Sequence, residues 1–157
     1  MTKEDLNTYA MKVTQASRSG LIVLIYEIAA AYIVDALKAH TAGDIEEFRK
    51  NLRKARGFIS ELASSLDMKY EISARLLSIY LFMNRTLNMD DIKGVTTDLE
   101  RIRDMLLNLR GAFETVSKND TSGPVMENAQ KVYEGLTYGK DSSANTYTDT
   151  TGRGYKA

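Results

Sequence analysis

The sequence predicts an all-α protein: an antiparallel four-helix bundle with an N-terminal arm, a short C-terminal helix and a disordered tail. The chain has one proline in 157 residues and ten glycines, most of them late, so long segments are free of helix breakers. Apolar residues recur at spacings of three and four in several of these segments, which is the period of a helix that packs on a core. A chain of this length typically forms one domain with one core.

We expect the bundle domain to cover residues 1–136 and the polar tail to cover residues 137–157. The tail is rich in Thr, Ser, Gly and Asp and has no aliphatic stripe, so it cannot bury enough surface to offset the entropy of ordering. The domain divides into an arm, four long helices and a short helix, because short polar connections separate the periodic segments. In chain order these elements are residues 1–17, about 18–41, 44–66, 69–89, 91–118 and 124–136.

The arm and the short C-terminal helix are both weakly amphipathic. In the arm, "DLNTYAMKVTQAS", the apolar side chains lie three or four residues apart on one side of a weak helix or extended segment. They are Leu6, Tyr9, Val13 and Ala16. The short helix opens with Pro124, a residue suited to a first helical turn. Its stripe consists of Val125, Ala129, Val132 and Leu136. Either segment could lie over an apolar groove.

The first long helix is unusually apolar. Over residues 21–40, "LIVLIYEIAAAYIVDALKAH", only four side chains are polar or charged: Glu27, Asp35, Lys38 and His40. A rotation of about 100° per residue places Glu27, Ala31, Asp35 and Lys38 on one narrow strip and leaves the remaining circumference apolar. Two mid-helix carboxylates argue against a membrane span, and the polar start of the chain argues against a signal peptide. We therefore expect a soluble, cytoplasmic protein.

The second and fourth long helices each carry a single apolar stripe. The second opens with Asp44 and Glu47, a D-x-x-E capping pattern. Its stripe comprises Ile45, Phe48, Leu52, Ala55, Ile59, Leu62 and Leu66. The stripe of the fourth comprises Ile92, Val95, Leu99, Ile102, Leu106, Leu109, Phe113 and Val116. Sustained spacing of this kind indicates helices that bury one face in a bundle.

The third long helix has two apolar faces. One comprises Ile72, Leu76, Ile79, Tyr80, Met83 and Leu87, and the other Ala74, Leu77 and Leu81. The first and third helices thus have more apolar surface than one bundle interface uses, and a spare face suits an incoming amphipathic helix. The alternative is that the spare faces are core, because a helix at the centre of a packing is apolar all round.

Several short motifs resemble the FliS family of flagellar secretion chaperones, which bind flagellin. The run "SSLDMKYEISARLLSIYLFMNRTL" and the upstream arm "YAMKVTQAS" carry the resemblance, with "IYEIA" at 25–29 between them. The matching positions are Tyr9, Ala16 and Ser17 in the arm, Ser65, Leu66 and Asp67 in a turn, and Leu76, Ile79, Tyr80, Phe82, Met83, Arg85 and Leu87. The motifs occur in the same order and at the same spacing as in the family over about residues 6–116. Three positions depart from it: Ile28, Arg75 and Leu81 stand where the family favours glycine, asparagine and aspartate.

The resemblance implies a small bundle that holds the C-terminal helical segment of flagellin in the cytoplasm, prevents premature polymerisation and presents the subunit to the export apparatus. A component of the export gate is a further expected partner, and the oligomeric state is left open. We expect the client to contact the spare faces and the arm. The candidate partner-binding residues are Tyr9, Val13, Leu24, Ile28, Leu76, Leu77, Tyr80, Leu81, Met83 and Leu87. The alternative function is a helical-bundle adaptor or self-associating protein with a different helical partner.

The sequence lacks most of the side-chain combinations that enzymes use for catalysis. The chain has no cysteine and one histidine, His40, which we expect either at the surface or as a residue that interacts with the dipole at a helix C-terminus. Neither a di-iron site nor a Cys–His or Ser–His–Asp set is therefore available. A serine–lysine pair is left open. We expect no catalytic activity, cofactor or metal. Because 21 basic residues balance 21 acidic ones, we expect neither a nucleic-acid nor a membrane partner, and we interpret the basic run at 49–56 as a solvated face.

Overall fold

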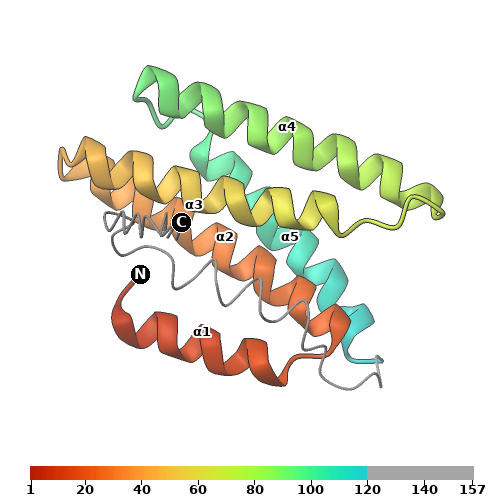
Figure 1. Cartoon of the computed structure of the whole chain (residues 1–157). Helices are drawn as coiled ribbons and strands as arrows, with labels where there is room; N and C mark the ends of the chain where they lie inside the picture. The colour runs from red at the N-terminus through yellow and green to blue at the C-terminus, as the bar shows by residue number, and fades with distance from the viewer. Residues whose placement is uncertain (120–157) are drawn as a thin grey trace, which may run out of the picture.

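The computed structural model describes residues 1–119, and this part of the chain is entirely helical with no strand (Figure 1). The helices are α1 (Lys3–Gln15), α2 (Arg18–Thr41), α3 (Ile45–Ser64), α4 (Glu71–Lys93) and α5 (Leu99–Ser117). The prediction of an all-α bundle is confirmed. The predicted short helix at 124–136 and the predicted tail at 137–157 lie outside the described residues.

Helix α2 is the centre of the bundle (Figure 1). It packs along its length against α3 on one side and α5 on another, whereas α4 packs on α3 and α1 on α2. The rings of Tyr32 and Phe58 stack at 5.8 Å between α2 and α3, and those of His40 and Phe48 meet at 5.1 Å nearer the connection between the two helices. These pairings run in opposite directions along the two helices, as an up-and-down bundle requires.

The central position of α2 explains why its sequence is so apolar. Its buried residues surround most of the circumference, and Ala29 and Ala36, both fully buried, permit close approach of a neighbouring helix. By length and composition α2 could cross a membrane, but 56% of its most apolar window is buried inside the protein, and the core helix of a soluble protein passes the same test. For α2, the interpretation of the spare apolar face as core is therefore correct.

Side-chain caps begin the first three helices. Thr2 and Asp5 form a reciprocal capping box at α1, so the predicted weak helix or extended arm is a regular helix. The hydroxyl of Ser17 accepts the Gly20 N–H at 3.2 Å at the start of α2. The predicted cap of α3 is confirmed, because the Asp44 carboxylate accepts the Glu47 N–H at 2.9 Å.

The predicted start of the last helix at residue 91 is wrong. Helix α4 continues past the predicted end at 89 to Lys93, and α5 begins only at Leu99. Gly94 ends α4 in the left-handed region, with φ +67°, a conformation that glycine adopts without steric cost. Ile92 is consequently an exposed residue of α4, and Val95 lies in the connection rather than on the stripe of α5.

The structure agrees with one of the two positions predicted for His40, the C-terminal end of a helix rather than the open surface. His40 lies in the last turn of α2, as expected, and it is half-buried against Phe48. Its Nε2 atom is 3.1 Å from the carbonyl oxygen of Gly94, which caps α4. His40 thus joins the end of α2 to the connection between α4 and α5.

Candidate functional site

Most of the predicted partner-binding residues lie in the core of the described structure. Seven of the ten are buried: Val13, Leu24, Ile28, Leu76, Tyr80, Met83 and Leu87. A partner cannot reach these side chains unless a covering segment moves. Tyr9 of α1 and Leu77 of α4 are half-buried, and Leu81 of α4 is exposed. The structure therefore does not gather the ten residues on one accessible surface.

The exposed apolar side chains of the described chain concentrate on α4. Leu81, Phe82 and Met89 are 58%, 40% and 44% exposed, respectively. Phe82 and Met89 are seven residues apart and share one side of the helix, whereas Leu81 lies with Leu77 on another. The sequence analysis did not assign Phe82 and Met89 to a binding surface. Their seven-residue spacing, two helical turns, is the signal that could have identified them.

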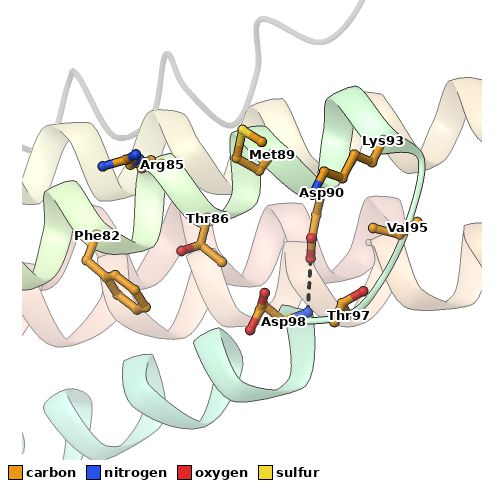
Figure 2. Close-up of a pocket in the computed structure, with 9 residues that line it drawn as sticks. All are labelled: Phe82, Arg85, Thr86, Met89, Asp90, Lys93, Val95, Thr97 and Asp98. Atoms are coloured by element: carbon orange, nitrogen blue, oxygen red, sulfur yellow. Dashed lines mark hydrogen bonds between the residues drawn. The ribbon is translucent and has the colours of Figure 1, made fainter.

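The side of α4 that carries Phe82 and Met89 faces an open pocket beside the connection to α5 (Figure 2). The pocket has a volume of about 470 Å³. Its lining comprises Phe82, Arg85, Thr86, Met89, Asp90 and Lys93 from α4, and Val95, Thr97 and Asp98 from the connection. The guanidinium carbon of Arg101 in α5 lies 5.4 Å from the centre of the Phe82 ring, a cation–π arrangement across the gap.

Asp90 lines the pocket where α4 meets the connection to α5. Its carboxylate accepts the Asp98 N–H at 3.1 Å (Figure 2), directly before α5 begins. The side chain is buried, and burial raises the pKa of its carboxyl group above the usual range, with the nearby Asp98 adding to the shift. The hydrogen bond from the Asp98 backbone opposes part of that shift. The hydrogen bond from the Asp98 backbone to Asp90 therefore holds the connection between α4 and α5 against the end of α4.

Two tyrosines join α4 to α2, although the backbones of these helices do not come into contact within the described residues. The hydroxyl groups of Tyr26 and Tyr80 form a hydrogen bond, and the ring of Tyr26 packs at 5.6 Å from that of Phe113 in α5. Burial raises the pKa of both hydroxyl groups, which remain neutral at physiological pH. Helix α4 therefore packs directly on α3 but is joined to α2 only through long side chains.

Helix α1 lies over the narrow polar strip of α2. The α-amino group of Met1 pairs with Asp35, which Lys38 also approaches at 3.4 Å. Val13 is the buried anchor of α1. Burial raises the pKa of the Tyr9 hydroxyl, and the carboxylate of Glu27 adds to the increase. An amphipathic α1 therefore covers part of α2, as the stripe of the arm predicted.

The basic run on α3 is largely paired. Arg49 and Arg56 approach the carboxylate of Asp91 in α4 at 3.6 and 4.0 Å, and Lys50 pairs with Glu47 at 3.0 Å. The sequence did not indicate the pairing of Arg49 and Arg56 with Asp91, which lies on another helix. Among residues 1–119, no group of three or more His, Cys, Asp or Glu side chains could hold a metal ion.

Comparison with known proteins identifies one family. The sequence profile of the family described as "Flagellar protein FliS" matches residues 3–120, a range that contains all five described helices. The flagellar secretion chaperone FliS of Bacillus subtilis (strain 168) is 28% identical to the chain over 108 residues, which cover 69% of this chain and 81% of that protein.

Proposed function

The chain belongs to the FliS family of flagellar proteins, and on this premise we propose that it is a flagellar export chaperone that binds the C-terminal helical segment of flagellin. The proposed role is to hold the subunit in the cytoplasm, prevent its premature polymerisation and aid its delivery to the export apparatus. A component of the export gate is then a second partner. This role requires binding and release of a client and involves no catalysis.

The observation that carries the proposal is the unpartnered apolar surface of α4. This helix packs on α3 along one side and meets α5 only weakly, so Leu81, Phe82 and Met89 remain exposed. Exposed apolar side chains that cluster on one element commonly mark a surface for a partner. A row of such residues along a helix suits an amphipathic helix, which can place its own apolar face against them.

We define the client surface as Leu77, Leu81, Phe82 and Met89. Leu77 and Leu81 belong to the second apolar face that the sequence predicted, and Phe82 and Met89 extend the surface toward the pocket beside α5. The buried residues of α4 in the predicted set, Leu76, Tyr80, Met83 and Leu87, support this surface from beneath. Leu24 and Ile28 of α2 are buried, and a partner could reach them only if the segments packed against them moved away.

Glutamate substitutions on α4 test this surface. Replacement of Leu81 or Phe82 by Glu places a charge where the client's apolar side chains would be buried, and an unpaired buried charge is costly. We expect flagellin to bind each variant at least about tenfold more weakly, equivalent to about 1.4 kcal/mol. Because both side chains are exposed, the variants should unfold at nearly the same temperature as the unmodified protein.

The matched control is Leu107→Glu. Leu107 is also an exposed leucine, but it lies on α5 outside the client surface. Flagellin should bind this variant with unchanged affinity. An equal loss of binding for all three variants, or no loss for Leu81→Glu and Phe82→Glu, would contradict the assignment of the surface.

The same exposed side chains also suit a different helical partner or a second copy of the chain, which is the alternative function. Sedimentation equilibrium distinguishes these possibilities. Concentration-dependent self-association that Leu81→Glu abolishes, together with no binding of flagellin, would favour a self-associating protein over a flagellin chaperone.

A further inference from the structure

We infer that the pocket beside α5 selects a client helix that carries a carboxylate on either side of an apolar residue. The inference rests on the function proposed above and gives the chemistry of the client segment. It concerns the rim of the pocket, which we define as Arg85, Met89 and Lys93 of α4. These residues are spaced four apart and share one row of the helix, so the row reads cation, apolar side chain, cation.

The rim is the row of pocket residues that a partner reaches from solvent. Another row of α4, comprising Phe82, Thr86 and Asp90, points toward α5 and the connection (Figure 2). There the Asp90 carboxylate accepts the Asp98 N–H at 3.1 Å. The rim residues lie along the other edge of the helix in this view, and all three are exposed. A helix that approaches the pocket from outside therefore meets the rim.

The acidic residues of the pocket leave both cations of the rim without an ion pair. The carboxylate of Asp98 lies 3.9 Å from the guanidinium of Arg101, and that of Asp90 is buried. Burial raises the pKa of Asp90, and the positive charge of Lys93 is among the effects that oppose this shift. Within residues 1–119, however, neither Arg85 nor Lys93 forms a salt bridge. Both cations can therefore bind a carboxylate from a partner.

Other charged groups of α4 are paired within the protein. Arg75 pairs with Glu71 at 3.0 Å, one turn away on the same helix. Asp91 is approached by Arg49 and Arg56 of α3 at 3.6 and 4.0 Å. The rim is thus a positive surface on a helix whose remaining basic residue already has an acidic partner.

The spacing of the rim determines the pattern of its partner. Arg85 and Lys93 are eight residues apart, which is about 12 Å along the helix axis. A helix that packs along α4 at a shallow crossing angle of about 20° stays beside the rim over that length. Two carboxylates eight residues apart on such a helix lie opposite the two cations, and an apolar side chain midway between them lies over Met89. The flexible thioether of Met89 can adapt to different apolar side chains.

The charges of the rim select among apolar helices, whereas the apolar contacts of the client surface provide most of the affinity. An exposed ion pair contributes little, because water screens it. A helix with basic residues at the same two positions would meet like charge and bind more weakly. The rim therefore discriminates between segments of similar hydrophobicity.

Neutralisation of the rim tests this selection. Arg85→Gln/Lys93→Gln removes both cations, and the control Arg53→Gln/Lys69→Gln makes the same change in net charge at exposed positions on α3 and on its connection to α4. At about 50 mM salt, monomeric flagellin should bind the rim variant about three- to tenfold more weakly than the control variant. At about 500 mM salt the two affinities should converge.

All four substituted side chains are exposed, so thermal denaturation should show the same stability for both variants. Equal affinities of the two variants for flagellin at the lower salt concentration would overturn the inference and leave the proposed chaperone function intact.

An exchange of charges between the partners tests the pattern itself. The probe is the C-terminal segment of flagellin with each acidic residue replaced in turn by lysine. One replacement should weaken binding to the unmodified protein and restore binding to Arg85→Glu, and a second, eight residues away, should do the same for Lys93→Glu. If flagellin binds but no such pair of acidic positions exists, the inference is overturned and the proposed function stands. No binding of flagellin to the unmodified protein would contradict both.

Discussion

The hydroxyl groups of Tyr26 and Tyr80 share a hydrogen bond in the interior of the bundle and thereby join α2 to α4. Both rings are almost completely buried, and the backbones of the two helices are not in contact. Of the exposed residues that we assign to the client surface, Phe82 and Met89 lie on the opposite side of α4 from this contact, whereas Leu81 lies about 100° of helical rotation from Tyr80. The Tyr26–Tyr80 pair, together with the packing of α4 on α3, therefore positions the client surface relative to the rest of the bundle.

Removal of one hydroxyl group should destabilise the protein more than removal of both. Tyr26→Phe leaves the Tyr80 hydroxyl buried without its partner, at a cost of about 1–3 kcal/mol in the free energy of unfolding. The double variant Tyr26→Phe/Tyr80→Phe removes both polar groups and should regain most of that loss. Urea denaturation measures the cycle, with the exposed Tyr70→Phe as the control. Strictly additive losses in the double variant would contradict a direct hydrogen bond.

Two glycine substitutions should have opposite effects on stability. Gly94 has φ +67° and free space around it, so Gly94→Ala introduces backbone strain without a clash and should destabilise the protein by about 1 kcal/mol. Gly57 is in the interior of α3, also with free space, and Gly57→Ala should stabilise it by about 0.5–1 kcal/mol. Thermal denaturation measures both. A stabilising Gly94→Ala would show that the end of α4 does not require the left-handed conformation.

The stability of the protein should fall at alkaline pH in part because of Tyr32. Burial raises the pKa of its hydroxyl to about 12, and the carboxylates of Asp35 and Glu47 contribute. Between pH 10 and 12 the unfolded chain loses this proton while the folded chain keeps it, so the free energy of unfolding falls as pH rises, by about 2–3 kcal/mol. In Tyr32→Phe this part of the decline should be absent. Parallel pH profiles of the two proteins would contradict the assignment.

Deletion of residues 2–16 should strengthen or accelerate client binding. This segment contains α1, which covers part of α2 through Val13 and is held near Asp35 at its start. A lid of this kind lowers the apparent affinity, because only the open fraction of the protein can bind. Titration of a flagellin C-terminal peptide into the full-length and truncated proteins measures the effect. Weaker binding after deletion would instead identify α1 as a clamp that closes on the bound client, and identical affinities and on-rates would exclude both roles.

The helices could be predicted from the sequence because the information is local. The capping pattern at Asp44 and the stripe of α3 depend on residues within a few turns of one another. The break between α4 and α5 was predicted at residue 90 instead of at Gly94, because a glycine inside a helical pattern does not by itself end a helix. The end at Gly94 is accompanied by a buried hydrogen bond between Asp90 and Asp98, eight residues apart, which periodicity cannot reveal.

The candidate site was predicted only in part, since periodicity identifies an apolar face but not the element that covers it. Met83 and Leu81 both looked suitable for a partner, yet Met83 is fully buried and Leu81 is exposed. Phe82 was missed because Ser78 and Arg85, which flank it on the surface of the helix, are polar, and Met89 was missed because its neighbours in the sequence, Asn88 and Asp90, are polar. The contact between Tyr26 and Tyr80 could not be inferred either, because it joins residues 54 positions apart across the bundle.

The measurement that tests the account most directly is a calorimetric titration of the full chain with two forms of monomeric flagellin, one intact and one that lacks the C-terminal segment. If the protein is a chaperone for that segment, intact flagellin will bind with a negative heat-capacity change, because apolar surface is buried, and the truncated form will give no binding signal. Equal affinity for the two forms would show that the client is recognised elsewhere, and the absence of binding to both would contradict the proposed function.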